Sequence, residues 1–260
     1  EPTRLGMITY AVFCLKKRFT EEKKLLEQVG QQLTDGATFI DLGAMSTRPG
    51  SKEISEMEET ERLLPALRSV VKEFPSAIIS IDTYRSEIAK KAIDLGAHLI
   101  NDISGGKFDT NMIPTISKLK VPYIMMHTLA KPETMQHNPV YSDVIKEIIQ
   151  FFSRQLQALR ELEVQDVILD PGFGFGKTME HNYHILKHFN EFNLLHCPLL
   201  AGVSRKGMIW KLLEITPQNA LNGTTVAHTL ALQNGAKILR VHDVKPAVEA
   251  IKIVDFYQKQ

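Results

Sequence analysis

The chain has 260 residues, of which 43% are hydrophobic and 23% are charged, so it can bury a full core. Its 31 basic and 30 acidic residues give a net charge of +1, which excludes the strongly basic balance of a nucleic-acid-binding protein. No apolar run reaches the ~20 residues of a membrane span, the start lacks a secretory signal, and two cysteines cannot form a disulfide framework. We therefore expect a cytoplasmic protein.

Short β-branched runs alternate with longer segments of helical periodicity along the chain. Segments 19–33, 58–74 and 142–162 repeat apolar residues at three- and four-residue spacing, which is typical of amphipathic helices. Eight such strand and helix units predict a single (β/α)8 TIM barrel as one domain over 1–260, with a doubly wound sheet as the alternative. The predicted strands, in chain order, are RLGMITYAV (4–12), TFIDLGA (38–44), AIISIDT (77–83), HLINDIS (98–104), PYIMMHT (122–128), DVILDPG (166–172), PLLAGVS (198–204) and ILRVHDV (238–244).

A weak internal repeat supports the barrel. DGATFIDLG, LGAHLINDI and NGAKILRVHD each place a glycine and an alanine between a helical segment and a strand that ends in polar residues. Glycine tolerates positive φ, so we expect Gly36, Gly96 and Gly235 to end the preceding helices in a left-handed conformation.

Polar residues gather where the predicted strands end. In a TIM barrel the loops that follow the strands converge at this end and form the active site, so the pattern predicts an active site at the C-terminal ends of the strands. Any one of these residues can also be a loop cap or a satisfied buried group. The strand-end residues are Asp41, Asp82, Asn101, Asp102, His127, Asp170, Ser204, Arg205, Arg240, His242 and Asp243.

Two loops carry cations suited to anions or flat rings. MSTRPGS has a turn composition, and its Arg48 can reach an anion or stack on a ring, although a solvated arginine in an ordinary turn looks the same. GVSRKG precedes the apolar MIWKLL, which predicts that Ser204, Arg205 and Lys206 lie beside the N-terminus of a helix.

The last strand presents a cation and an imidazole together. Arg240 and His242 alternate in RVHD, so we expect them on one face of the strand. A structural zinc site is not expected, because the sequence has no HExxH or CxxC spacing, but a magnesium ion shared with a substrate phosphate needs few protein ligands. Other histidines fall in or beside a surface helix: His181, His184, His188 and His196.

The glycine-rich stretch DPGFGFGKT, residues 170–178, is not a phosphate loop. Its spacing satisfies neither GxxxxGK[ST] nor GxGxxG, and the helical periodicity that follows argues against a hairpin. We interpret it as a loop at the rim of the barrel that supplies the Asp170 carboxylate and an aromatic edge.

Together these motifs resemble one family, dihydropteroate synthase. The resemblance rests on DLGAMSTRPGS, SIDTYR, NDISGG, the MMH of the fifth strand, DPGFGFGKT, GVSRKG and RVHDV, in this order from about residue 20 onward. It implies a transferase of folate biosynthesis that condenses 6-hydroxymethyl-7,8-dihydropterin diphosphate with p-aminobenzoate, by a dissociative mechanism with Mg2+. It also implies a cytoplasmic homodimer and a sulfonamide target.

Site residues follow from the resemblance, position by position. The catalytic set would be Asp82, Asp170, Lys206, Arg240 and His242. The pterin would contact Asp82, Asn101, Met126, Asp170, Lys206 and Arg240, with Arg240 and His242 also holding the diphosphate. Gly202 would belong to the substrate-binding set. The aminobenzoate would be bordered by Ser46, Thr47, Arg48, Pro49, Phe175 and Lys206.

The first loop departs from the family pattern. Relatives carry a sequence like NVTPDSFSDGG after the first strand, with an asparagine that binds magnesium, whereas this chain reads GMITYAVFCLKKRFTEEKK and leaves the metal ligand unknown. Three explanations compete: a loop segment missing from the sequence, a catalytically impaired pterin-binding homologue, or a divergent strand whose metal ligand comes from elsewhere. A pterin-dependent methyltransferase is a further alternative. Gly207 also replaces a serine found in many relatives.

Overall fold

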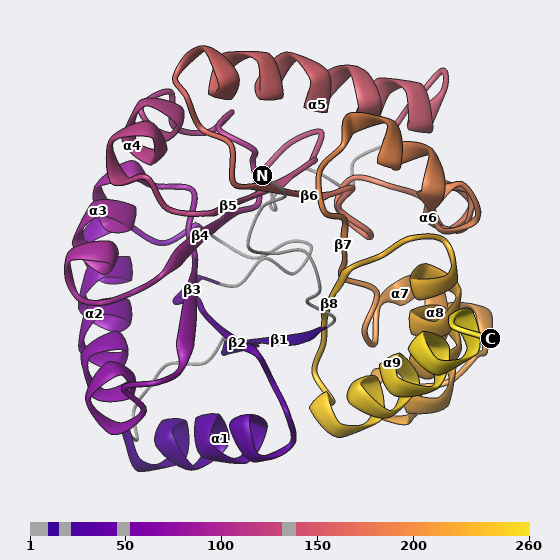
Figure 1. Ribbon diagram of the computed structural model, residues 1–260, viewed down its shortest axis with the longest axis horizontal. Coiled ribbons are helices and arrows are strands. Elements are labelled where there is room, and N and C mark those ends of the chain that lie inside the picture. Colours follow the sequence, from indigo (N-terminus) through magenta and orange to yellow (C-terminus); the bar gives the residue numbers. More distant parts are fainter. Residues whose placement is uncertain (1–9, 16–21, 46–52, 132–138) are drawn as a thin grey trace.

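The computed structural model describes residues 10–15, 22–45, 53–131 and 139–260, and Figure 1 shows its course. The strands are Tyr10–Leu15 (β1), Phe39–Leu42 (β2), Ile78–Asp82 (β3), Leu99–Asp102 (β4), Tyr123–Met126 (β5), Val167–Asp170 (β6), Leu200–Ala201 (β7) and Ile238–Arg240 (β8). The helices are Glu22–Thr34 (α1), Glu56–Glu73 (α2), Ser86–Asp94 (α3), Met112–Leu119 (α4), Val144–Glu161 (α5), Met179–Lys187 (α6), Gly207–Leu212 (α7), Leu221–Gln233 (α8) and Val244–Gln258 (α9), with 3-10 turns at Phe189–Leu195 (η1) and Pro217–Asn219 (η2).

All strand pairs are parallel, in the order β6-β5-β4-β3-β2-β1-β8-β7. A parallel bridge between Leu169 and Leu199, and a 2.9 Å hydrogen bond from the Leu169 N–H to the Pro198 carbonyl, join β6 to the segment that enters β7. The helices surround the strands on the outside (Figure 1). The predicted (β/α)8 barrel is therefore confirmed, and the doubly wound alternative is wrong because β1 pairs with β8.

Seven of the eight described strands fall inside the runs predicted for them. The exception is the first, which we expected over 4–12 and which is described at Tyr10–Leu15; residues 4–9 lie outside the described residues. The last two strands are much shorter than predicted. β7 ends before Gly202, and β8 ends at Arg240 before the expected His242.

The repeated glycines end helices as predicted. Gly36, Gly96 and Gly235 each have φ +100°, a left-handed conformation that suits glycine. The alanine after each one donates its N–H to a carbonyl five residues earlier, at 2.9, 3.0 and 2.9 Å respectively. This is the Schellman arrangement, and it turns the chain from a helix into the next strand.

Inward-facing side chains form two layers in the barrel. The lower layer is an apolar cluster of Phe39, Leu99, Ile124, Ile168, Leu200 and Ile238. Because strand side chains alternate, the residue two places further on each strand also points inward, one layer higher. These second-layer residues are Asp41, Asn101, Met126, Asp170, Gly202 and Arg240, and Asp82 of β3 lies at the same level because it pairs with Asn101. The fold thus places an apolar floor beneath a mostly polar upper layer. Among the described helices, none is long and apolar enough to cross a membrane.

Candidate active site

A guanidinium joins two carboxylates in the upper layer. Arg240 Nε lies 2.9 Å from Asp41 Oδ2, and an Arg240 terminal nitrogen lies 3.0 Å from Asp82 Oδ2. The Asn101 amide donates to the same Asp41 oxygen at 3.0 Å. Four strands, β2, β3, β4 and β8, therefore contribute to one hydrogen-bonded cluster, which brings three predicted site residues together as expected.

Asp41 is the residue of this cluster that sequence reasoning missed. The sequence marks it as a polar strand end, and the family resemblance assigns it no role in the site. Its side chain is fully buried, one oxygen is shared by Arg240 and Asn101, and Oδ1 has no hydrogen-bond partner among the described residues. The signal that could have found it is its inward position in β2, two residues after Phe39 of the apolar floor.

Asp170 ends β6 and lies in the same upper layer, two residues after Ile168 of the apolar floor. Its Oδ1 accepts the Gly172 N–H at 2.8 Å, which fixes the carboxylate against the start of the DPGFGFGKT loop. Burial raises the pKa of Asp170, while the charge of Lys206, the Gly172 N–H and the charge of Arg240 oppose that shift. The loop turns away at once, with positive φ at Gly172, Gly174 and Gly176. The expected rim loop is confirmed.

Lys206 brings a second cation to this end of the barrel. It is the residue before α7, as predicted, and its ammonium bonds to the Phe173 carbonyl and lies 4.8 Å from the centre of the Phe175 ring. A methyl group added at Gly202 would lie 3.8 Å from Asp170 Oδ2, 3.8 Å from Arg240 Cβ and 3.9 Å from the Lys206 ammonium. Gly202 therefore keeps open the space between these side chains.

His242 lies at the rim rather than in the strand. We expected it on the same strand face as Arg240, but β8 ends at Arg240, so this expectation is wrong. His242 is exposed. It is held by Ser204, which follows β7: the Ser204 hydroxyl oxygen accepts the His242 backbone N–H at 3.1 Å and lies 3.0 Å from His242 Nδ1.

Asp102 faces away from the pocket. It is fully buried and accepts hydrogen bonds from the Tyr123 hydroxyl at 2.7 Å and from the backbone N–H groups of Ser104 and Gly106 at 2.7 and 2.8 Å. Burial raises the pKa of Asp102, and these donors oppose the shift. This strand-end carboxylate holds the loop after β4 and is not part of the pocket.

A buried lysine contacts the DPGFGFGKT loop and His127, which the sequence analysis identified as a polar strand end. Lys177 is 3% exposed, and its ammonium nitrogen lies 3.0 Å from the Phe175 carbonyl and 3.1 Å from His127 Nδ1. Burial lowers the pKa of both Lys177 and His127 well below their usual values. Lys177 was noted within the loop, but no local pattern indicates that it is buried.

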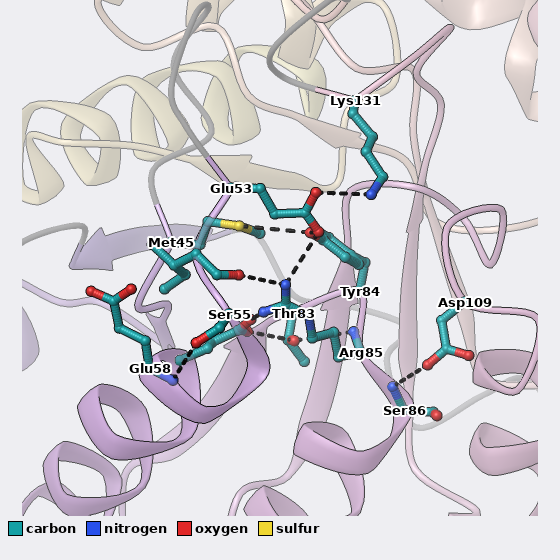
Figure 2. Close-up of polar contacts among 12 residues, drawn as sticks. Met45, Glu53, Ser55, Glu58, Thr83, Tyr84, Arg85, Ser86, Asp109 and Lys131 are labelled. Atoms are coloured by element: carbon teal, nitrogen blue, oxygen red, sulfur yellow. Dashed lines mark hydrogen bonds and ion pairs between the residues drawn. The ribbon is translucent and has the colours of Figure 1, made fainter.

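Ser46, Thr47, Arg48 and Pro49 lie outside the described residues. The residues on either side of that segment, Met45 and Glu53, are described, and Figure 2 shows both beside Tyr84. Among the described ranges, no group of three histidine, cysteine, aspartate or glutamate side chains could hold a metal ion.

Comparison with known proteins places this geometry in a family. Residues 8–242 match the family model described as pterin binding enzyme. A dihydropteroate synthase from Haemophilus influenzae is 36% identical over 256 residues, which cover 97% of this chain and 92% of the relative.

Solved structures agree with this assignment. The crystal structure of the Yersinia pestis dihydropteroate synthase with a sulfonamide drug complex matches with a TM-score of 0.92 and 34% identity, covering 97% of this chain and 95% of that one. The Thermus thermophilus enzyme in complex with 4-aminobenzoate matches with a TM-score of 0.87 and 35% identity, at the same two coverages.

Proposed function

The chain belongs to the dihydropteroate synthase family of pterin-binding enzymes, and we propose that it condenses 6-hydroxymethyl-7,8-dihydropterin diphosphate with p-aminobenzoate. The products are 7,8-dihydropteroate and pyrophosphate, in folate biosynthesis. The observation that supports the proposal best is the cluster of Asp41, Asp82, Asn101 and Arg240 above the apolar floor of a barrel that matches this family. The 260 residues would act as one catalytic domain.

The pterin would lie in the polar upper layer of the barrel. A flat heterocycle with several donors and acceptors needs fixed partners, because unpaired buried polar groups are costly. Asp82, Asn101 and Asp170 offer such partners from three strands, and Lys206 adds a donor. The buried Met126 side chain, in the same layer, would pack against the ring.

Charge in the pocket suits a dissociative path, in which pyrophosphate leaves first and the aminobenzoate nitrogen then attacks a pterin cation. Asp41, Asp82 and Asp170 are all buried, so carboxylates surround the position where positive charge would develop. Arg240, 20% exposed, and the exposed His242 would face the departing diphosphate. No covalent enzyme intermediate is required.

The aminobenzoate would bind beside Phe175 and Lys206. The Lys206 ammonium lies 4.8 Å from the centre of the buried Phe175 ring, so a cation and an aromatic face are presented together. A benzoate carries a carboxylate and a ring, which these two groups complement. Ser46, Thr47, Arg48 and Pro49, outside the described residues, would complete this end of the site.

The proposed reaction uses Mg2+. The described residues assemble no protein-held metal centre, so the fit to such a centre fails there. When bound, Mg2+ would neutralise charge on the diphosphate, and it can be held largely by substrate oxygens. A cytoplasmic location and a homodimer complete the proposal. The apolar residues of α5, among them Ile148, Phe152 and Leu159, are buried in the core of this chain, so this face of α5 is not available as the interface.

The deciding assay combines dihydropterin diphosphate, labelled aminobenzoate and Mg2+ with the protein. We expect labelled dihydropteroate. Pterin binding without product would contradict the proposal and favour the catalytically impaired homologue, which the unusual first loop GMITYAVFCLKKRF suggests. Methyl transfer from a methylated pterin to a corrinoid protein would favour the methyltransferase alternative.

A sulfonamide should compete with aminobenzoate and not with the pterin substrate. The expected pattern is a raised KM for aminobenzoate at constant kcat, because the drug shares the ring and the polar group that Phe175 and Lys206 would contact. Steady-state inhibition measured against each substrate in turn checks this. Equal displacement of both substrates by the sulfonamide would contradict the assignment of the pterin and the aminobenzoate to separate ends of the site.

Gly202→Ala should block the pterin without unfolding the protein. The added methyl would make ordinary contacts of 3.8 to 3.9 Å, so the free energy of unfolding should change by less than about 0.5 kcal/mol. It would nevertheless occupy the space between Asp170, Lys206 and Arg240, and we expect the KM for the pterin diphosphate to rise about 10- to 100-fold. Urea denaturation and steady-state kinetics measure the two effects. An unchanged KM for the pterin diphosphate would show that the pterin does not bind at this position.

A further inference from the structure

A network of polar side chains lies at the rim of the barrel, outside the pocket. We call Glu53, Tyr84, Arg85 and Lys131 the rim network (Figure 2). Tyr84 and Arg85 follow β3, Glu53 lies shortly before α2, and Lys131 lies in the segment after β5. Three segments that are far apart in the sequence are therefore joined by side chains at one place.

Tyr84 is the centre of this network. Its ring is 5% exposed and packs in one apolar cluster with Met45, Met126 and Phe175. Its hydroxyl donates to Glu53 Oε1 and lies 3.8 Å from Met45 Sδ (Figure 2). The Tyr84 hydroxyl thus contacts Met45 and Glu53, the residues on either side of segment 46–52. The Tyr84 ring belongs to the same apolar cluster as Phe175.

Ion pairs hold Glu53 in place. Its Oε2 lies 2.9 Å from the Lys131 ammonium, and its Oε1 lies 3.2 Å from a terminal nitrogen of Arg85, which also donates to the Ile54 carbonyl at 2.6 Å. Hydrogen bonds from Tyr84 and Lys131 lower the pKa of Glu53, so the carboxylate is charged at neutral pH.

Arg85 is itself anchored in the core. It forms an ion pair with Glu59 of α2, whose side chain is fully buried and also accepts the Thr83 hydroxyl at 2.7 Å. A buried ion pair that is also hydrogen-bonded has one well-defined geometry, because leaving either charge unpaired is costly. The rim network is therefore fixed to the barrel through α2 and β3.

We propose that Tyr84 is a positioning residue for the aminobenzoate end of the site, acting through Glu53. The hydroxyl of Tyr84 contacts both Glu53 and Met45, and its ring packs with Met45 in the cluster that contains Phe175. The inference rests on the proposed function. The polar partners proposed for the pterin are held by a different set of contacts, centred on Arg240 and Asp41.

The test separates the hydroxyl of Tyr84 from its ring. Tyr84→Phe keeps the ring and its edge contact with Phe108, at 5.4 Å between centroids, and removes only the polar contacts. We expect the KM for aminobenzoate to rise about five- to tenfold, the range that one lost hydrogen bond produces, with kcat and the KM for the pterin diphosphate within twofold of wild type. Glu53→Gln should show the same split.

A double variant and matched controls sharpen the result. Because Tyr84 and Glu53 act through one shared contact, Tyr84→Phe with Glu53→Gln should raise the KM by less than the product of the single effects. Glu87→Gln removes an acid from an exposed ion pair with Lys90, and Tyr257→Phe removes an exposed hydroxyl; both should leave all constants unchanged.

Each outcome has one meaning. If wild type makes no dihydropteroate, the proposed function fails, and the inference fails with it. If wild type is active but Tyr84→Phe leaves the aminobenzoate KM unchanged, or raises both KM values equally, only the inference fails. A lower free energy of unfolding with unchanged KM values would mean that the network stabilises the fold alone and would also overturn the inference.

Discussion

Arg240→Ala is expected to raise the KM for the pterin diphosphate about 100-fold or more, because it removes the cation at the leaving-group end and leaves two buried carboxylates without it. Asp41 and Asp82 would then repel the diphosphate. Asp82→Asn keeps the Arg240 contact with Asp41, so the KM of this variant for the pterin diphosphate should rise only about tenfold. Steady-state kinetics with the pterin diphosphate as the varied substrate compares the two variants.

Arg240→Lys separates charge from geometry. A lysine keeps the positive charge but cannot bridge Asp41 and Asp82 as a planar guanidinium does, so we expect a KM between those of wild type and Arg240→Ala. Urea denaturation of each variant tests that it is folded. If Asp82→Asn weakens diphosphate-substrate binding more than Arg240→Ala does, the assignment of Arg240 to the leaving-group end is wrong.

Gly172→Ala is expected to lower the free energy of unfolding by at least about 3 kcal/mol and to remove most activity. Gly172 has φ +75°, and an added Cβ would lie 2.0 Å from the His127 carbonyl oxygen, a backbone atom at the end of β5 that cannot move aside. The Gly172 N–H also fixes Asp170 at 2.8 Å, so the displaced loop would release a pocket carboxylate. Urea denaturation and kcat/KM measure the two losses.

Gly30→Ala is the matched control for that prediction. Gly30 lies inside α1, and an added Cβ would meet the Phe74 ring at 3.4 Å, an ordinary contact. Alanine favours a helix interior, so the free energy of unfolding should stay the same or increase by up to about 1 kcal/mol. A Gly172→Ala protein as stable and active as the Gly30→Ala control would show that the DPGFGFGKT loop tolerates another course.

Most of the barrel could be predicted because neighbouring residues in the sequence mark the ends of its helices and strands. The helix-ending glycines Gly36, Gly96 and Gly235 were identified from the residues around them, and their left-handed φ values agree. Strands buried on both faces read as apolar runs whose polar ends mark the mouth of the barrel. The end of β8 was misplaced because alternation in RVHD continues past the last backbone pairing, so His242 falls at the rim.

Parts of the site that depend on distant partners could not be predicted. Asp41 gives no local sign that it binds Arg240, 199 residues away, or Asn101. The burial of Lys177 depends on His127, which is 50 residues earlier, and the Tyr84 contact with Glu53 joins segments with no shared motif. The roles proposed for Asp82, Asn101, Asp170 and Lys206 rest on a family resemblance, and the structure supplies distances from which they can be tested.

The distance along the chain between Asp41 and Arg240 also bears on how the protein is made. Strands β2 and β3 are synthesised long before β8, which brings the guanidinium 199 and 158 residues after its two carboxylate partners. A chain that has been synthesised only as far as β7 therefore lacks the cation that pairs with both carboxylates. The proposed pterin site is complete only when β8 is in place, so a pterin diphosphate bound there would stabilise only molecules that have finished folding.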